Sequence, residues 1–195
     1  MKRIRSGTLT VAKSLVIVSG AALATLQPAN AQGTAAFEAT VKLQGISFTV
    51  ASPNTASGNT LTIVPKGLKL DNSPIELPVD GIVTAAEVGD LNVDGSPEIY
   101  VVGHGNGADR KGILIAYSAN RSKSLSGITV PPLAAKAATG YQGHDEFAVV
   151  ENVVVRRFPI YSSDGKPSGK RRQVQYKLKP GEASWKLVAD RTIEY

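Results

Sequence analysis

Cysteine is absent from this chain of 195 residues, and histidine occurs only twice, at His104 and His144. Without thiols the chain can form no disulfide framework, perform no thiol catalysis and carry no lipid on a cysteine. A zinc site built from several Cys and His ligands is excluded as well. A serine hydrolase would have to use one of the two histidines without the G-x-S-x-G nucleophile elbow, which the sequence lacks. We therefore expect a binding protein rather than an enzyme.

Long apolar runs are also missing, apart from one near the N-terminus. Four cations within the first 13 residues precede an apolar run over residues 14–26, which is followed by Ala29-Asn30-Ala31. The run is shorter than the roughly 20 residues that a membrane-spanning helix needs. Its order of charge, apolar run and A-x-A site is typical of a secretory signal peptide, here residues 1–31. We expect a mature chain of residues 32–195 in the periplasm or secreted, with no membrane anchor.

The positive charge of the whole chain belongs mainly to this leader. The full sequence has 22 basic and 16 acidic residues, a net charge of +6. Removal of the leader leaves 18 basic residues against the same 16 acidic ones, a net charge of +2. Nucleic acid is therefore not an expected partner. The basic residues between 166 and 179 are interpreted as a solvated surface.

Short strand-like segments separated by turn residues fill the rest of the sequence. They occupy residues 37–43, 46–50, 60–64, 68–70, 75–79, 82–88, 99–102, 113–117, 147–151, 153–158, 174–178 and 185–188. Alternating apolar and polar residues between Gly, Pro, Asn and Asp are typical of antiparallel sheets. We predict an all-β fold, an antiparallel β-sandwich of about eight or more strands, in one domain over residues 32–195. The last four segments should form two hairpins, residues 133–139 a short helix, and residues 103–111 and 161–172 exposed loops.

An acidic turn interrupts the strands between residues 88 and 99. Its oxygen-bearing side chains are Asp90, Asn92, Asp94 and Glu98, and Gly95 permits a sharp reversal. One interpretation is an Asx turn, in which these side chains bond their own backbone. The other is a calcium site with Asp90, Asn92, Asp94 and Glu98 as ligands, since alternate Asx oxygens suit a hard cation. The match to an EF-hand loop is partial, because Glu98 is at the ninth position and the flanks are strand-like.

Several short motifs follow one another between residues 87 and 161. They are EVGDLNVDGSPEIY (residues 87–100), ANR (119–121), VPPL (130–133), GYQGHD (140–145) and RRFPIY (156–161). In this combination the chain resembles the bacterial periplasmic inhibitors of invertebrate-type lysozyme. The resemblance implies an all-β inhibitor that often forms dimers and blocks a lysozyme by placing loops in its cleft. The implied partners are thus a lysozyme or another glycosidase and a second copy of the chain. No cofactor is required, and calcium is the only one considered.

One loop departs from that family. Its inhibitors carry a Ser-Gly-x-Tyr motif just before the strand equivalent to residues 113–117, where this chain reads Ala108-Asp109-Arg110-Lys111. We predict that the target is bound by His104, Asn106, Asp109, Arg110, Lys111, Tyr141 and His144. The alternative function is a calcium-stabilised module that binds cell-surface glycan without inhibiting an enzyme. An exposed aromatic platform would favour that alternative, whereas the only tryptophan, Trp185, alternates with its neighbours as a core residue would.

Overall fold

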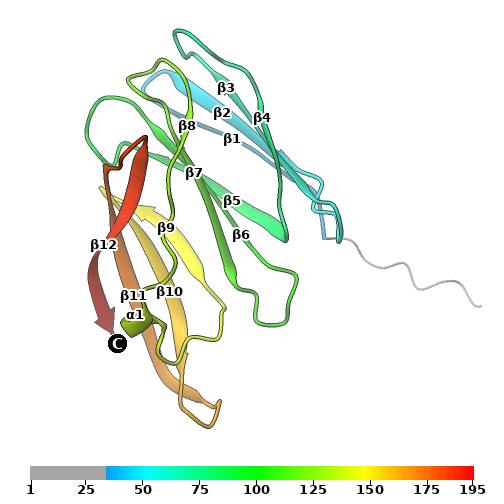
Figure 1. Ribbon diagram of the computed structural model, residues 1–195. Coiled ribbons are helices and arrows are strands. Elements are labelled where there is room, and N and C mark those ends of the chain that lie inside the picture. Colours follow the sequence, from blue (N-terminus) through cyan, green and yellow to red (C-terminus); the bar gives the residue numbers. More distant parts are fainter. Residues whose placement is uncertain (1–33) are drawn as a thin grey trace, which may run out of the picture. The chain divides into compact units, whose positions relative to one another are not determined.

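The computed structural model describes residues 34–195, which form an almost entirely β structure (Figure 1). The predicted signal peptide, residues 1–31, lies outside the described residues. Strands β1 to β12 form three antiparallel sheets of four strands each. The predicted all-β, antiparallel fold is therefore confirmed.

The three sheets follow one another along the chain. The first sheet contains β1 (Phe37–Leu43), β2 (Ile46–Ser52), β3 (Thr60–Lys66) and β4 (Ile75–Pro78). The central sheet contains β5 (Ile82–Gly89), β6 (Glu98–His104), β7 (Gly112–Ser118) and β8 (Ser126–Gly127). The third sheet contains β9 (Glu146–Val150), β10 (Val153–Tyr161), β11 (Pro167–Pro180) and β12 (Trp185–Glu194), in the order β12-β11-β10-β9. Within each sheet, every strand therefore pairs with its neighbour in sequence, as in a meander.

The central sheet is covered on both faces, because its strands alternate between two hydrophobic cores. On β6, Ile99 and Val101 belong to a core shared with Phe48 and Ile63 of the first sheet. Tyr100, between them, belongs to a second core shared with the third sheet. Successive side chains of a strand point to opposite faces, so one strand contributes to both cores. The sandwich thus has three layers, with β6 in the middle one.

The two predicted hairpins are confirmed, and three of their four strands, β10, β11 and β12, are longer than expected. Val150 pairs with Val153 in the first hairpin, and Pro180 pairs with Trp185 in the second. Strand β11 begins at Pro167, so the expectation of an exposed loop over residues 161–172 was wrong for most of that range. Polar and basic composition suggested a loop there. Pairing with β10 and β12 stabilises the strand instead.

Two further boundaries differ from the prediction. Residues 68–70 are not a strand: the amides of Lys69 and Leu70 donate to the carbonyls of Ser122 and Lys123 in the loop after β7. The glycine-rich loop is also shorter than predicted, because β6 extends to His104. Both differences arise from tertiary backbone pairing, which local composition does not predict.

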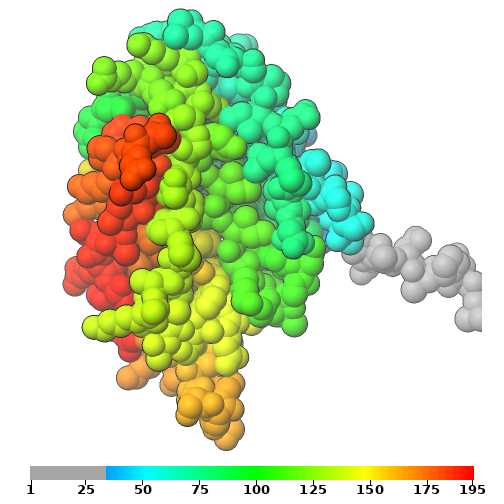
Figure 2. Space-filling model, in the orientation of Figure 1, coloured from blue at the N-terminus to red at the C-terminus, as the bar shows by residue number. Residues whose placement is uncertain are grey.

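The predicted helix is present as one turn, α1 (Ala135–Ala138). It lies in the segment that links β8 to β9. Figure 2 shows this segment running along the surface beside β12, where Thr129 forms a parallel bridge with Lys186. Among residues 34–195, no helix is long and apolar enough to cross a membrane.

Candidate functional site

The loop between β6 and β7, residues 105–111, is a compact turn with a closed base. The amide of Gly105 donates to the carbonyl of Lys111 at 2.8 Å. The Lys111 ammonium pairs with the Asp109 carboxylate at 3.0 Å, and the Lys111 side chain remains 65% exposed. Arg110 is exposed too, at φ 44°, in the left-handed region. This β6–β7 loop therefore presents two neighbouring cations from a defined backbone conformation.

Arg110 is held by the histidine at the end of β6. Its Nη2 lies 2.8 Å from Nε2 of His104, and Nδ1 of His104 lies 3.0 Å from the carbonyl oxygen of Gly105. A guanidinium only donates hydrogen bonds, so Nε2 accepts and Nδ1 carries the proton that is donated to Gly105. The hydrogen bond to His104 therefore orients the Arg110 side chain.

The β6–β7 loop rests against a second turn, residues 140–145. The amide of His144 donates to the carbonyl of Asp109 at 2.8 Å. At Gly143, φ is +89°, and a Cβ atom would lie 1.9 Å from the Asp109 carbonyl oxygen. Only glycine allows this approach. The two turns therefore meet through their backbones, at the position where the sequence reads Gly-His-Asp.

A buried carboxylate joins these turns to the third sheet. The Asp145 side chain is 0% exposed and accepts hydrogen bonds from Nε of Arg156 at 2.6 Å, the amide of Gly112 at 2.7 Å and the hydroxyl of Tyr141. The Tyr141 oxygen in turn accepts from Nη2 of Arg156 at 2.9 Å. Because Gly112 is the first residue of β7, Asp145 fixes the end of the β6–β7 loop directly.

Aromatic rings enclose the cation of this network. The guanidinium carbon of Arg156 lies 5.1 Å from the ring centre of Tyr141, 5.5 Å from that of Phe147 and 5.8 Å from that of Phe158. These distances are within the cation–π range. Burial, together with the hydrogen bond to Asp145, raises the pKa of Tyr141 to about 12. Tyr141 therefore stays protonated at neutral pH and remains a donor to Asp145.

A hollow of about 410 Å³ lies beside the two turns. It is lined by residues 84–85 of β5, residues 102–104 of β6, Arg110, and residues 144–147. Three of the predicted target-binding residues, His104, Arg110 and His144, border this hollow together. The hollow thus combines an exposed guanidinium and two imidazoles with the exposed carboxylate of Glu146.

The other predicted target-binding residues lie around this hollow or away from it. Asp109 and Lys111 form their ion pair on the β6–β7 loop, and Tyr141 is set behind Asp145 in the buried network. Asn106 is turned away, toward the carbonyl of Ala56 at 3.5 Å, and borders a different hollow formed by the loop between β2 and β3.

The sequence does not predict the pairing of Asp145 with Arg156, although both belong to motifs noted above. A weak signal was present. Arg156 follows Val154 and Val155 in an apolar strand segment and is itself 12% exposed, and a cation in such a segment needs a partner. The identity of that partner depends on how the turn at residues 140–145 folds back, which no local pattern encodes.

The acidic turn has the hydrogen bonds of an Asx turn. Oδ1 of Asp90 accepts from the amide of Asp94 at 3.0 Å, and Oδ2 accepts from the amide of Gly95 at 2.9 Å. Oδ1 of Asn92 also accepts from the Asp94 amide, at 3.1 Å. From outside the turn, Nε2 of Gln44 donates to Oδ2 of Asp90 at 2.7 Å. Backbone and side-chain donors thus surround these oxygens and hold the turn in shape.

Glu98, the fourth predicted calcium ligand, points into the protein. Glu98 is 0% exposed. Its Oε2 accepts a hydrogen bond from the amide of Leu91 at 2.8 Å, and its Oε1 accepts one from the hydroxyl of Ser118 at 3.4 Å. Burial, and secondarily repulsion by Asp90 and Asp94, raises the pKa of Glu98 to about 8. A largely protonated carboxyl is a poor ligand for a cation. Over residues 34–195, no group of three or more His, Cys, Asp or Glu side chains is arranged to hold a metal ion. The calcium hypothesis stays a prediction.

No protein-family model, curated protein or solved structure matches the chain. The resemblance to lysozyme inhibitors therefore stays a prediction from the sequence motifs. What the structure adds is the geometry of the two turns and of the network that joins them.

Proposed function

We propose that this protein binds and inhibits a lysozyme-like glycosidase by inserting the β6–β7 loop into the active-site cleft of the enzyme. The observation that carries the proposal is the exposed pair Arg110 and Lys111 on a loop whose base is fixed from both sides. Most glycosidases act through two carboxyl groups that flank the scissile bond. A loop that delivers two cations is complementary to such a cleft.

The fixed base of the loop favours tight binding. Ordering a mobile loop on association costs free energy, and a loop that already has its bound conformation avoids that cost. Asp145 holds the Gly112 end of the loop, and the contact between Asp109 and His144 holds its tip region. The buried network thus contributes to binding through loop geometry, without itself touching a target.

Arg110 has a partner that a carboxylate can replace. Its hydrogen bond to His104 is a single bond to a ring nitrogen, not to a carboxylate. A bidentate bond from a guanidinium to a carboxylate is stronger, because both partners are charged and two parallel bonds form. Inside a desolvated cleft Arg110 should therefore exchange His104 for a catalytic carboxylate, and the protein acts as a binding protein rather than as a catalyst.

The proposal includes export to the periplasm or the medium, where a lysozyme would be encountered. Export is inferred from the leader in the sequence. The homodimer implied by the resemblance stays a prediction, which sedimentation of the purified protein would test.

The direct test is inhibition of purified lysozymes of several structural classes, the invertebrate type first. Removing a paired and desolvated interfacial cation costs about 2 to 5 kcal/mol. The double substitution Arg110→Ala with Lys111→Ala should therefore raise the inhibition constant more than tenfold. Folding stability should change little, because both side chains are exposed.

A charge-matched control separates a local contact from general electrostatic attraction. Lys69 and Lys123 are both exposed. Lys123 is in the loop that follows β7, at the end of that strand away from the β6–β7 loop, and the segment of Lys69 is hydrogen-bonded to the same loop. Lys69→Ala with Lys123→Ala removes the same charge and should leave the inhibition constant within about threefold of wild type. If the two double variants weaken inhibition equally, or if no lysozyme is inhibited by the wild type, the proposed interface is wrong.

A further inference from the structure

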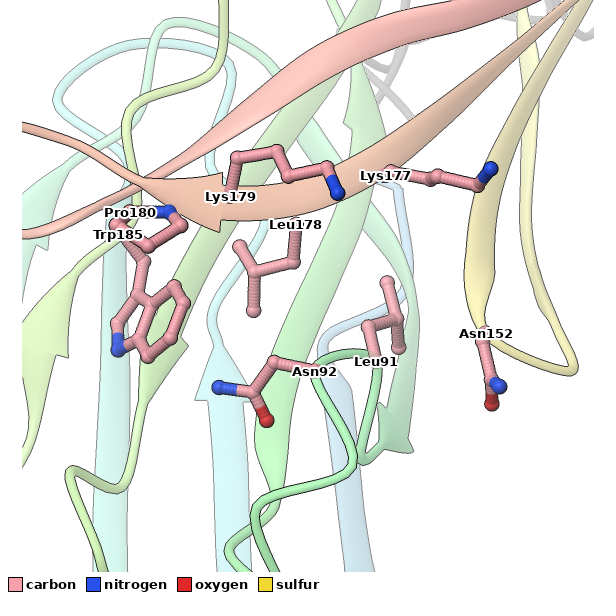
Figure 3. A pocket seen from close by; sticks show the side chains of 8 residues that line it. All are labelled: Leu91, Asn92, Asn152, Lys177, Leu178, Lys179, Pro180 and Trp185. Carbon is pink, nitrogen blue, oxygen red and sulfur yellow. The ribbon is translucent and has the colours of Figure 1, made fainter.

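A second hollow lies at the opposite end of β6 from the β6–β7 loop (Figure 3). Its volume is about 440 Å³, within the roughly 300–1,000 Å³ typical of small-molecule pockets. It is formed between the acidic turn, the turn that joins β9 to β10, and the β11–β12 hairpin; besides Lys177 and Lys179, its lining residues are Leu91, Asn92, Asn152, Leu178, Pro180 and Trp185. Seven strand residues at about 3.3 Å each separate the two ends of β6 by about 20 Å, so this hollow is distinct from the proposed interface.

The only tryptophan of the chain forms one wall. Trp185 shares a face of β12 with Leu187 and packs against the second core, as its alternation in the sequence indicates. It lies at the start of the strand, however, where the core ends, so its ring is only half-buried. Figure 3 shows the indole on one side of the hollow and Leu91 on the other, with Leu178 between them, and the two leucines, Leu178 and Leu91, are 5% and 6% exposed. The hollow thus has an aromatic wall and an apolar floor.

Polar groups with unused hydrogen-bonding capacity complete the lining. The Asn152 side chain is exposed and forms no hydrogen bond with any of residues 34–195, and the same holds for the indole N–H of Trp185. Asn92 uses one N–H of its amide on Asp94, at 3.0 Å, and one N–H remains. Amide groups both donate and accept, so they are suited to ligands whose polar groups also do both.

Charged side chains of both signs lie in or near the lining of the hollow. Lys177 is paired with Asp190 at 3.0 Å. Lys179 lines the hollow as well, without an ion pair among residues 34–195, and Figure 3 shows both lysine side chains extending along β11, away from Leu178. Two acidic residues are close to the lining asparagines in the sequence. Asp94 is two residues after Asn92, and Glu151 directly precedes Asn152. A neutral ligand avoids the repulsion that either an anion or a cation would meet here.

We propose that this hollow binds a neutral oligosaccharide. One pyranose ring packs its apolar C–H face on the indole of Trp185, and its hydroxyl groups form hydrogen bonds with Asn92 and Asn152. An aromatic ring provides large contact area at low conformational cost, and hydroxyl groups match the mixed donors and acceptors of the amides. The site does not depend on the proposed inhibition, since the two surfaces are at opposite ends of β6, and both ligands can be bound together.

The single tryptophan makes the test specific to this hollow, because all tryptophan fluorescence comes from Trp185. Purified protein is titrated with three neutral trisaccharides, namely chitotriose, cellotriose and maltotriose, and with the anionic trigalacturonate. We expect a saturable change in Trp185 emission with at least one neutral trisaccharide and none with trigalacturonate. Titration extends to roughly 10 mM, tenfold above a dissociation constant of about 1 mM.

Two substitutions and a matched control identify the contacts. Asn152→Ala removes an exposed amide and should weaken binding about three- to tenfold, as expected for one hydrogen bond. Gln175→Ala removes an amide from β11 that does not line the hollow and should leave the affinity unchanged. Trp185→Phe preserves an aromatic wall, and calorimetry in place of fluorescence should show weakened but measurable binding. Circular dichroism melts of each variant confirm that it is folded.

Three outcomes would overturn the proposal: no neutral trisaccharide binds, trigalacturonate binds better than all of them, or Asn152→Ala and Gln175→Ala bind alike. Lysozyme inhibition measured on the same Asn152→Ala sample should equal that of wild type. Failure of the saccharide site is therefore distinguishable from failure of the proposed function.

Discussion

Replacing Asp145 by Asn should destabilise the protein strongly, although the change is nearly isosteric. The Asp145 side chain is fully buried, and its carboxylate faces the guanidinium of Arg156, whose side chain is 12% exposed. Asn keeps one oxygen, whose two lone pairs can still accept from Gly112 and Tyr141. It removes the negative charge, and one of the donors from Arg156, Tyr141 and Gly112 then meets an NH₂ group.

The size of the effect follows from the burial of both partners. Removing one member of a buried ion pair typically costs about 3 to 5 kcal/mol, because the other charge remains in a site of low polarity. The aromatic rings around Arg156 and the retained amide offset part of this cost, so we expect a loss of about 3 kcal/mol. At this chain length, that corresponds to a fall in melting temperature of about 6 to 12 °C.

Urea unfolding followed by circular dichroism measures this loss, and an exposed ion pair provides the control. Asp164 pairs with Lys166 at 3.1 Å, and their side chains are 55% and 80% exposed. Asp164→Asn should leave the unfolding midpoint nearly unchanged, because exposed pairs contribute little.

A double-mutant cycle tests the cause. Arg156→Met should cost less in the Asp145→Asn background than in the wild type, since the unpaired cation has then been removed. The reasoning is refuted if Asp145→Asn loses less than about 1 kcal/mol, or if the two substitutions are additive within about 0.5 kcal/mol.

Three further predictions concern the acidic turn and the leader. Because the pKa of Glu98 is raised from 4.5 to about 8, mainly by burial, the folded protein retains a proton that the unfolded chain loses at lower pH. The resulting stabilisation is complete below about pH 4.5 and declines as the pH rises to about 8, by at most about 1.4 kcal/mol per pH unit. Glu98→Gln should flatten this decline in urea unfolding measured across that range, and an equal decline in the variant would assign it to other groups. The melting temperature should be the same in excess chelator and in excess calcium if the turn is an Asx turn, whereas a rise with calcium would establish a bound ion by mass action. Mass spectrometry of exported protein should give an N-terminus at Gln32, and an intact leader would contradict the predicted cleavage.

The sequence alone determined the class of fold and the place of the turns. Alternation of apolar and polar residues is a local property of a strand, so the all-β class and the two C-terminal hairpins could be predicted from it. The Asx pattern of Asp90, Asn92 and Asp94 is equally local, because each side chain bonds an amide two to five residues away. The exposed positions of Arg110 and Lys111 followed from the composition of their loop.

Which distant residues meet depends on long-range packing. Glu98 reads as a member of an acidic turn, but the strand that begins there buries it between two layers, next to Ser118. Asp145 and Arg156 are paired because the turn at residues 140–145 folds back onto β10, and Trp185 borders a hollow because its strand begins where the core ends. The third layer also depends on the tertiary structure. Ile99 and Val101 lie on one face of β6 and Tyr100 and Val102 on the other, and whether a sheet covers each face depends on long-range packing that no local pattern records.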